Sequence, residues 1–204
     1  MASARCWIGA ALALALTPAA AAPAVVGQSA PTFGVADSSG KTVSLADFKG
    51  KTVVLEWVNP GCPYVRKHYD SANMQATQKG AAGQGVVWLS GNSTHPSHYD
   101  YKKPAEMAAW MNAQKAAATH TLMDSEGKIG RAYGARTTPH LYIVDAKGTL
   151  VYAGGIDDKP SANPADVKTA KNHVNAALAD LAAGKAVAQA VTRAYGCSVK
   201  YSDG

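Results

Sequence analysis

Cys62 lies where a cysteine ionises most easily, after a buried strand and at the start of a helix. The strand is predicted over residues 53–58, because every residue there except Glu56 is apolar. The first turn of a helix carries unpaired N–H groups and partial positive charge, and both favour thiolate over thiol. Because the thiolate is the nucleophile, this position predicts a reactive cysteine. A second cysteine at Cys-x-x-Cys spacing is absent, since Val65 takes that place.

The first 22 residues have the features of an export signal. Arg5 is the only charged side chain before an apolar run over residues 6–16, and alanines at 19–22 suit cleavage. The run is too short for a transmembrane helix, which needs roughly 20 apolar residues. The sequence therefore predicts a signal peptide over 1–22, which includes Cys6. It also predicts an exported, periplasmic protein without stable membrane insertion.

The rest of the chain is long enough for one domain with its own core. We expect this domain over residues 23–183, followed by a C-terminal tail over 184–204. The formal net charge is +6, but lysines and arginines are scattered and form no dense block. Nucleic acid is therefore not an expected partner.

Removal of the predicted signal leaves two cysteines, Cys62 and Cys197. Disulfides persist in exported proteins, so two cysteines are first considered as a possible pair. Cys197 has three possible roles: it resolves an oxidised Cys62, it forms a permanent bridge with Cys62, or it is a free or intermolecular thiol of the tail. Its neighbours Gly196 and Ser198 favour a mobile tail that reaches Cys62 and leaves it again.

The order of strands and helices predicts an α/β fold, with a central mixed sheet and helices on both of its faces. The chain should end in a helix and a tail. We expect short extended pieces near Phe33 and over 42–45, strands over 86–90 and 121–124, a β-hairpin over 141–152, and helices over 62–79, from Pro104, over 127–133 and over 164–183.

Three motifs resemble the thioredoxin-like redoxins, and in particular a subgroup of exported bacterial peroxiredoxin-like proteins of the AhpC/TSA type. They are NPGCPYV at 59–65, ARTTP at 135–139 and YGCSVKY at 195–201. The lead-in GQSAPTF at 27–33 and the stretch 40–51 are also typical of this branch. The resemblance extends over almost all of the predicted mature chain and implies a thioredoxin-like fold.

In the thioredoxin family, the residue that matches Pro139 is a cis-proline facing the reactive cysteine. The resemblance therefore implies a cis bond between Thr138 and Pro139. Cis X-Pro bonds are uncommon in folded proteins, at roughly 5–6%. Such a bond would present the backbone of Thr138 beside the Cys62 sulfur, ready to pair with an extended substrate.

Two positions depart from the peroxiredoxin pattern. Peroxiredoxins carry a threonine three residues before the reactive cysteine, where this chain has Asn59, and an arginine where it has Pro139. A peroxidase needs hydrogen-bond donors for the peroxide oxygens and positive charge for the thiolate. We expect Asn59, Arg136, Thr138 and the Pro139 loop to orient the substrate, with Arg66 as a second source of charge or as a solvated residue of a helix face.

The resemblance implies an enzyme, an exported thiol-dependent oxidoreductase without an organic cofactor. Cys62 would attack a peroxide or a substrate disulfide, Cys197 would resolve the product, and a thiol donor protein or small thiol would recycle the pair. One alternative is a thiol-disulfide reductase without peroxidase activity, which both departures favour. Another is a non-enzymatic binding module, with copper as its possible ligand and a structural Cys62–Cys197 disulfide.

Metal binding would use cysteine with histidine, a donor set that suits Cu(I). No Cys-x-x-x-Cys spacing is present and the histidines are dispersed, so we expect no metal site. Glu56 is predicted to be buried, either passing protons to Cys62 or serving as a satisfied core carboxylate. The six histidines are His68, His95, His98, His120, His140 and His173.

Overall fold

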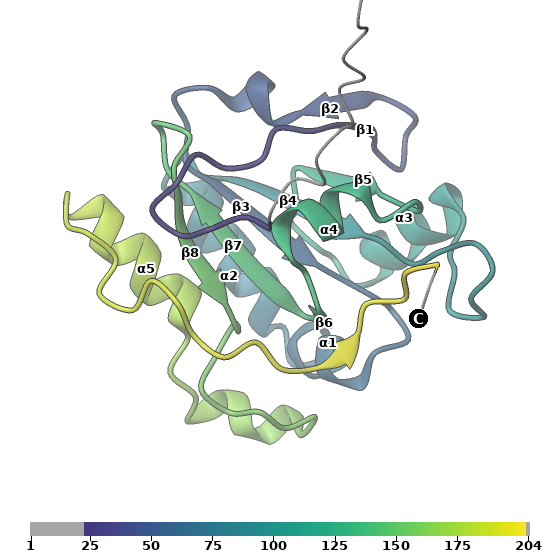
Figure 1. Cartoon of the computed structure of the whole chain (residues 1–204). Coiled ribbons are helices and arrows are strands. Elements are labelled where there is room, and N and C mark those ends of the chain that lie inside the picture. Colours follow the sequence, from purple (N-terminus) through teal and green to yellow (C-terminus); the bar gives the residue numbers. More distant parts are fainter. Residues whose placement is uncertain (1–22, 203–204) are drawn as a thin grey trace, which may run out of the picture.

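A five-stranded mixed sheet forms the centre of the computed structural model, which describes residues 23–202 (Figure 1). The predicted signal peptide, with Cys6, lies outside the described residues. In spatial order the strands are β5 (His120–Met123), β4 (Val87–Asn92), β3 (Val53–Trp57), β7 (His140–Val144) and β8 (Leu150–Gly154). Strands β3, β4 and β5 run parallel, and β7 and β8 pair antiparallel. This arrangement confirms the predicted α/β class.

The central strand β3 confirms the buried strand expected from its apolar run. All five of its residues are buried, because β4 and β7 flank it and both sheet faces are covered. Trp57, its last residue, pairs with Gly91 of β4 and His140 of β7. The strand thus brings the following loop, with Cys62, to one end of the sheet.

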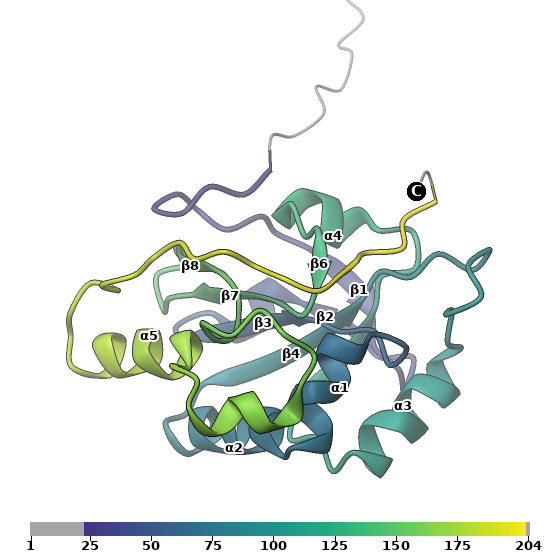
Figure 2. The same ribbon diagram turned by 90° about the horizontal axis from the view of Figure 1, so that it is seen from below.

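Helices cover both faces of the sheet, and alternation along the strands divides the core into two clusters. Val54 and Val58 face the first cluster, and Val53 and Trp57 face the second. Figure 2 shows the helices of the first face on one side and α4 on the other. The first face carries α1 (Pro63–Asp70), α2 (Asn73–Gly83), α3 (Pro104–Ala113) and α5 (His173–Ala182); the second carries α4 (Lys128–Tyr133), the hairpin of β1 (Gly34–Ala36) and β2 (Thr42–Ser44), and the 3₁₀ helix η1 (Leu45–Phe48).

The helix expected over 62–79 is in fact two helices. Ala72 adopts a left-handed conformation with φ of 59°, which ends α1 and turns the chain into α2. The second of them, α2, also extends beyond residue 79 and ends at Gly83. Its buried residues Met74 and Ala81 pack into the core, and this packing outweighs the low helix propensity of Gly80.

The helix expected over 164–183 is also divided. A 3₁₀ helix, η2 (Pro164–Lys168), comes first, and α5 begins only at His173. The side chain of Asn172 caps α5 by accepting a hydrogen bond from the backbone N–H of Asn175 at 2.9 Å. This cap sets the start of the helix.

The C-terminal tail packs along the domain instead of standing free from it. From α5 it runs past β8, where Thr192 N–H donates to Ala153 O at 3.1 Å (Figure 1). It then forms β9 (Cys197–Ser198), a strand that the sequence pattern did not predict, against β6 (Thr137–Thr138). Beyond β9, the Tyr201 hydroxyl donates to Ala135 O at 2.7 Å. The structure thus holds Cys197 from both sides, unlike the mobile tail expected from its neighbours.

Glu56 is fully buried on the first face of the sheet. Its carboxylate accepts hydrogen bonds from the Tyr69 hydroxyl, Gln78 Nε2, Trp88 Nε1 and the Ser90 hydroxyl, at 2.8–3.3 Å. Burial raises the pKa of Glu56 above its usual value, and these donors partly oppose the shift. Of its two expected roles, the contacts fit the satisfied core carboxylate, which ties β3 to β4, α1 and α2.

Two histidines are held largely away from water. His68, on α1, is completely buried, and burial lowers its pKa to about 4. His140, at the start of β7, stacks on the Tyr142 ring with centroids 4.5 Å apart. Burial, and then the charge of Arg136, lowers the pKa of His140 to about 4 as well. Both side chains are therefore neutral in the folded protein near pH 7.

The two lowered pKa values predict an acid-sensitive fold. As the pH falls below about 6.5, the unfolded chain binds protons at His68 and His140 before the folded chain does. The free energy of unfolding should therefore fall between pH 6.5 and pH 4, by on the order of 2–3 kcal/mol for each histidine.

Urea denaturation at half-unit pH intervals measures this slope. His140→Gln, which removes one of the two shifted groups, should make the slope shallower than that of the unchanged protein. A free energy of unfolding that is constant from pH 6.5 to pH 4 would contradict the prediction.

Candidate active site

Cys62 is the N-cap residue of α1, in the position expected from the sequence. Its backbone is extended, with φ of −80° and ψ of 121°, and Pro63 occupies the first helical position. The side chain is only 1% exposed and belongs to the core cluster of the first sheet face. Its thiol donates a hydrogen bond to Thr138 O, with the sulfur 3.0 Å from that oxygen. The candidate nucleophile is thus closed off from solvent.

The Thr138–Pro139 bond is cis, which confirms the prediction. Thr138, the last residue of β6, and Pro139, which connects β6 to β7, are both buried. The backbone of Thr138 lies beside the Cys62 sulfur, as the resemblance implied. That backbone is already paired, because Thr138 is opposite Cys197 in the antiparallel β6–β9 ladder. The tail therefore takes the edge expected to receive an extended substrate.

Cys197 packs against the core cluster that contains Cys62, and both cysteines are free thiols. Burial, and then a hydrogen bond and charge interaction with Cys62, raise the pKa of Cys197 to about 12; Lys200 acts in the opposite direction. Cys197 therefore holds its proton in this arrangement. The fold brings together two thiols that are separated by most of the domain in sequence.

Gly196 allows β9 to lie this close to β6. Its φ is +142°, a value that residues with a side chain rarely adopt. A Cβ atom at this position would collide with the carbonyl oxygen of Thr138. The close approach of the tail to the Cys62 loop thus requires glycine here.

Asn59 shapes the turn that leads into Cys62. Its Oδ1 accepts a hydrogen bond from Gly61 N–H at 2.8 Å, and its main-chain oxygen accepts from Cys62 N–H at 3.0 Å. Its Nδ2 donates to Asp100 Oδ2 at 3.3 Å. A Cβ atom on Gly61 would lie 2.7 Å from Asp100 Oδ1, so the loop around Asp100 packs tightly on this turn. Asp100 is a site neighbour that the sequence pattern did not reveal.

Arg136 meets the site through its backbone. Its carbonyl oxygen accepts a hydrogen bond from Val199 N–H at 3.0 Å, which helps hold the tail. Its side chain is exposed, and its charge acts on His140 and Tyr142. The charge of Arg136 thus acts on Tyr142 in the core cluster of the second sheet face, whereas Cys62 packs in the core cluster of the first face.

Arg66 extends from α1 toward solvent. Its Nε lies 3.5 Å from Asp70 Oδ2, one helical turn further on, and both side chains are largely exposed. Such a pair contributes little to stability, ~0.3–0.5 kcal/mol. The contacts match the solvated helix face, the second of the two roles considered for Arg66.

The histidines are dispersed among different partners. His120 Nδ1 lies 2.8 Å from Asp37 Oδ2, and His68 Nδ1 lies 2.8 Å from Asn73 Nδ2. Within residues 23–202, no group of three or more histidine, cysteine, aspartate or glutamate side chains is arranged to hold a metal ion.

In the same part of the chain, no helix is both long and apolar enough to cross a membrane.

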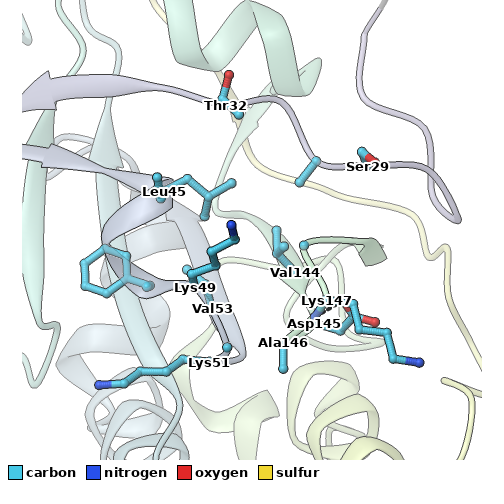
Figure 3. A pocket seen from close by; sticks show the side chains of 15 residues that line it. Ser29, Thr32, Leu45, Lys49, Lys51, Val53, Val144, Asp145, Ala146 and Lys147 are labelled. Atoms are coloured by element: carbon cyan, nitrogen blue, oxygen red, sulfur yellow. Dashed lines mark hydrogen bonds between the residues drawn. The ribbon is translucent and has the colours of Figure 1, made fainter.

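A pocket of about 570 Å³ lies at the other end of the sheet from Cys62 (Figure 3). Leu45, Val53 and Val144 line it, and Val53 begins the strand whose far end leads to Cys62. Figure 3 shows Lys51 and Lys147 extending to either side of this pocket. Because neither cysteine lines it, the pocket is separate from the candidate active site.

Solved structures with the same fold come from several bacteria. A hypothetical protein of Sinorhizobium meliloti 1021 has a TM-score of 0.73 at 24% identity and covers 88% of this chain and 96% of its own. An uncharacterized conserved protein of Geobacillus kaustophilus has a TM-score of 0.74 at 24% identity, with coverage of 88% and 94%. A thiol:disulfide interchange protein from Bacteroides sp. has a TM-score of 0.52 at 19% identity, with coverage of 72% and 88%. At these identities the likeness shows a thioredoxin-like fold.

The search of curated proteins gives no match. A family model does match, that of the AhpC/TSA family, over residues 26–153. The match covers more than half of the chain, including β3, the Cys62 turn and the cis-proline loop. It confirms the resemblance to AhpC/TSA-type redoxins seen in the motifs at 59–65 and 135–139, and it indicates thiol redox chemistry. The chain belongs to the AhpC/TSA family of thioredoxin-like redoxins.

Proposed function

We propose that this protein is an exported thiol peroxidase in which Cys62 is the nucleophile and Cys197 the resolving cysteine. The observation that carries the proposal is that Thr138 connects the two cysteines: its carbonyl oxygen accepts the hydrogen bond of the Cys62 thiol, and its backbone lies opposite Cys197 in the β6–β9 pair. The raised pKa of Cys197 supports the division of roles, because a thiol that keeps its proton is a poor first nucleophile. Family membership supports thiol redox chemistry in general.

The proposed cycle has three balanced steps. The Cys62 thiolate attacks one oxygen of a hydroperoxide, the O–O bond breaks, and the second oxygen leaves as an alcohol or water after taking up a proton. The Cys197 sulfur then attacks the Cys62 sulfenic acid, forms the disulfide and releases water. Finally, two equivalents of an external thiol reduce the disulfide and become a disulfide themselves. The donor is a small thiol or a thiol protein, and no organic cofactor takes part.

Asn59, Thr138 and the Pro139 loop are proposed to orient the reacting atoms. Asn59 supports the turn that holds Cys62, and Thr138 O accepts the hydrogen bond of its thiol. The charge of Arg136 acts on His140 and Tyr142. We therefore propose that Arg136 contributes through its carbonyl oxygen, which accepts a hydrogen bond from the tail.

The second candidate is a thiol-disulfide reductase without peroxidase activity. It is favoured by the β6 edge, which already binds an extended strand, β9, in antiparallel register. A substrate peptide that displaced β9 would meet the same backbone groups of Thr138. Asn59 and Pro139, which replace the threonine and arginine of peroxiredoxins, favour this activity as well.

Reaction with peroxide separates the two candidates. One equivalent of hydrogen peroxide should consume both thiols of the reduced protein, residues 23–204, and yield an internal disulfide. Cys62→Ser should abolish this loss, because no first nucleophile remains. Cys197→Ser should stop at the sulfenic acid, which dimedone traps. Thiol titration and intact mass measure all three results.

Two outcomes would overturn the peroxidase. Thiols that survive excess peroxide, in a protein that reduces a model disulfide, would establish the reductase instead. An internal disulfide that resists mild reductant would exclude both enzymes and leave a binding module with a structural bridge.

Removal of the tail from the Cys62 loop should expose the nucleophile. Gly196→Ala places a methyl group against Thr138 O, so β9 must move away from β6. We expect Cys62 to react with iodoacetamide at least ten times faster than in the unchanged protein, measured in a Cys197→Ser background. Gly184→Ala is the matched control, since φ there is +68° but the space around it is open. Equal rates in the two variants would show that β9 does not limit access to Cys62.

Export is proposed on the charge and apolar pattern of residues 1–22. Expression of the full chain in a Gram-negative host should give a periplasmic protein that begins near residue 23, as read from its intact mass. Substitution of Ala20 and Ala22 by bulky residues should block cleavage and leave the larger form. A cytoplasmic product of full mass from the unchanged chain would contradict export.

A further inference from the structure

A buried polar cluster joins α1 to the tail two residues before Cys197. It consists of Lys67 and His68 from α1, Asp157 from the loop after β8, and Tyr195 from the tail. Lys67, His68 and Asp157 are almost completely buried, and Tyr195 is buried as well. The steps proposed for Cys62 and Cys197 do not use any of these groups. Their position in the core therefore calls for another explanation.

The Tyr195 hydroxyl is the shared member of the cluster. Lys67 Nζ and His68 Nε2 each lie 3.2 Å from it, and it donates a short hydrogen bond to Asp157 Oδ1. Lys67 Nζ also lies 3.3 Å from Asp157 Oδ2 and donates to Lys159 O at 2.7 Å. Buried charges remain in a core only when they are paired and hydrogen-bonded. Each member therefore restrains the others, and Tyr195 has little freedom to move.

This cluster lies close in the chain to both cysteines. Cys62 is the N-cap residue of α1, and the same helix carries Lys67 and His68. The helix therefore sets the distance between Cys62 and the cluster. Tyr195 is separated from Cys197 by Gly196 alone. The Tyr195 ring also packs edge-on against Tyr64, with centroids 5.9 Å apart. The Tyr195 side chain of the tail thus contacts α1, the helix whose N-cap residue is Cys62.

We propose that Tyr195 is a positioning residue that holds Cys197 within bonding reach of Cys62. The proposal deepens the proposed function and rests on it for the role of Cys197. After a peroxide has converted Cys62 to its sulfenic acid, the Cys197 sulfur attacks the Cys62 sulfur, and water leaves with the sulfenic oxygen. Tyr195 gains or loses no atom or electron. Its part is to keep the effective concentration of Cys197 high.

The other side of the tail offers a matched comparison. Tyr201 donates a hydrogen bond to Ala135 O at 2.7 Å, but two backbone hydrogen bonds hold the same stretch. They run from Val199 N–H to Arg136 O at 3.0 Å and from His95 N–H to Lys200 O at 2.7 Å. The loss of the Tyr201 hydroxyl should therefore leave Cys197 in place. The loss of the Tyr195 hydroxyl removes the centre of the buried cluster.

Equilibration with reduced and oxidised glutathione measures the effective concentration directly. One glutathione disulfide oxidises the two protein thiols to the internal disulfide and becomes two glutathione thiols. Mass spectrometry after alkylation gives the equilibrium constant. The equilibrium constant of each variant is divided into that of the wild-type protein to give a fold-decrease. We expect the fold-decrease for Tyr195→Phe, which keeps the ring, to be at least five times that for Tyr201→Phe. A smaller difference overturns the proposal.

Urea denaturation of both variants shows whether a difference in global stability accounts for the result. If Tyr195→Phe does not fold, Asp157→Asn takes its place, because it keeps the shape of the side chain but weakens the bond to Tyr195. The fold-decrease in the equilibrium constant for Asp157→Asn should also be at least five times that for Tyr201→Phe. A smaller ratio overturns the proposal.

The same experiment distinguishes this inference from the proposed function. A wild-type protein that forms the internal disulfide with glutathione but does not react with peroxide rejects the peroxidase, while the ratio between the variants still decides the role of Tyr195. A wild-type protein that forms no internal disulfide at any glutathione ratio overturns both.

Discussion

The pairing of two short strands, β6 and β9, is the constraint on which the candidate site depends. It brings Cys197 opposite Thr138, whose carbonyl oxygen accepts the Cys62 thiol hydrogen bond. A two-residue strand pair has few hydrogen bonds of its own and is not stable by itself. The tail makes further hydrogen bonds on both sides of this pair, through Tyr195 before it and through Val199 and Tyr201 after it. Cys62 is thus enclosed both by the core cluster of the first sheet face and by the tail.

Two of the buried carboxylates, Glu56 and Asp157, have different parts in the architecture. Glu56 accepts hydrogen bonds from four side chains and joins the central strand to its neighbours, all within the body of the domain. Asp157 instead joins segments that the sheet does not connect, namely α1 and the tail. Removal of one partner from a buried pair leaves a charge that neither water nor protein satisfies. The chain therefore uses one buried carboxylate to consolidate its core and the other to attach the segment that carries Cys197.

What the sequence predicted correctly is mostly local. The apolar run of β3, the helix start at Cys62 and the hairpin of β7 and β8 follow from hydrophobic pattern and turn residues within short windows. The cis bond at Pro139 came from the resemblance to thioredoxin-like redoxins. The errors are of two kinds: the division of the long helices, which depends on a single left-handed residue at Ala72 and on capping by Asn172, and the contacts made by the tail. Lys67 and Tyr195 are 128 residues apart, and no periodicity within either segment indicates that they meet.

The position of β9 also bears on which substrates Cys62 can meet. The Thr138 edge holds one extended chain at a time, and β9 is already there. A protein disulfide must therefore compete with a segment of the same molecule that is tethered on both sides and so present at high effective concentration. A hydroperoxide has no need of this edge, because it carries no extended backbone to pair with Thr138. A hydroperoxide would therefore require a smaller displacement of the tail than a peptide, which would require release of the whole strand. On this ground the tail hinders the proposed peroxidase less than the proposed reductase, and for either proposal it holds Cys197 close to Cys62.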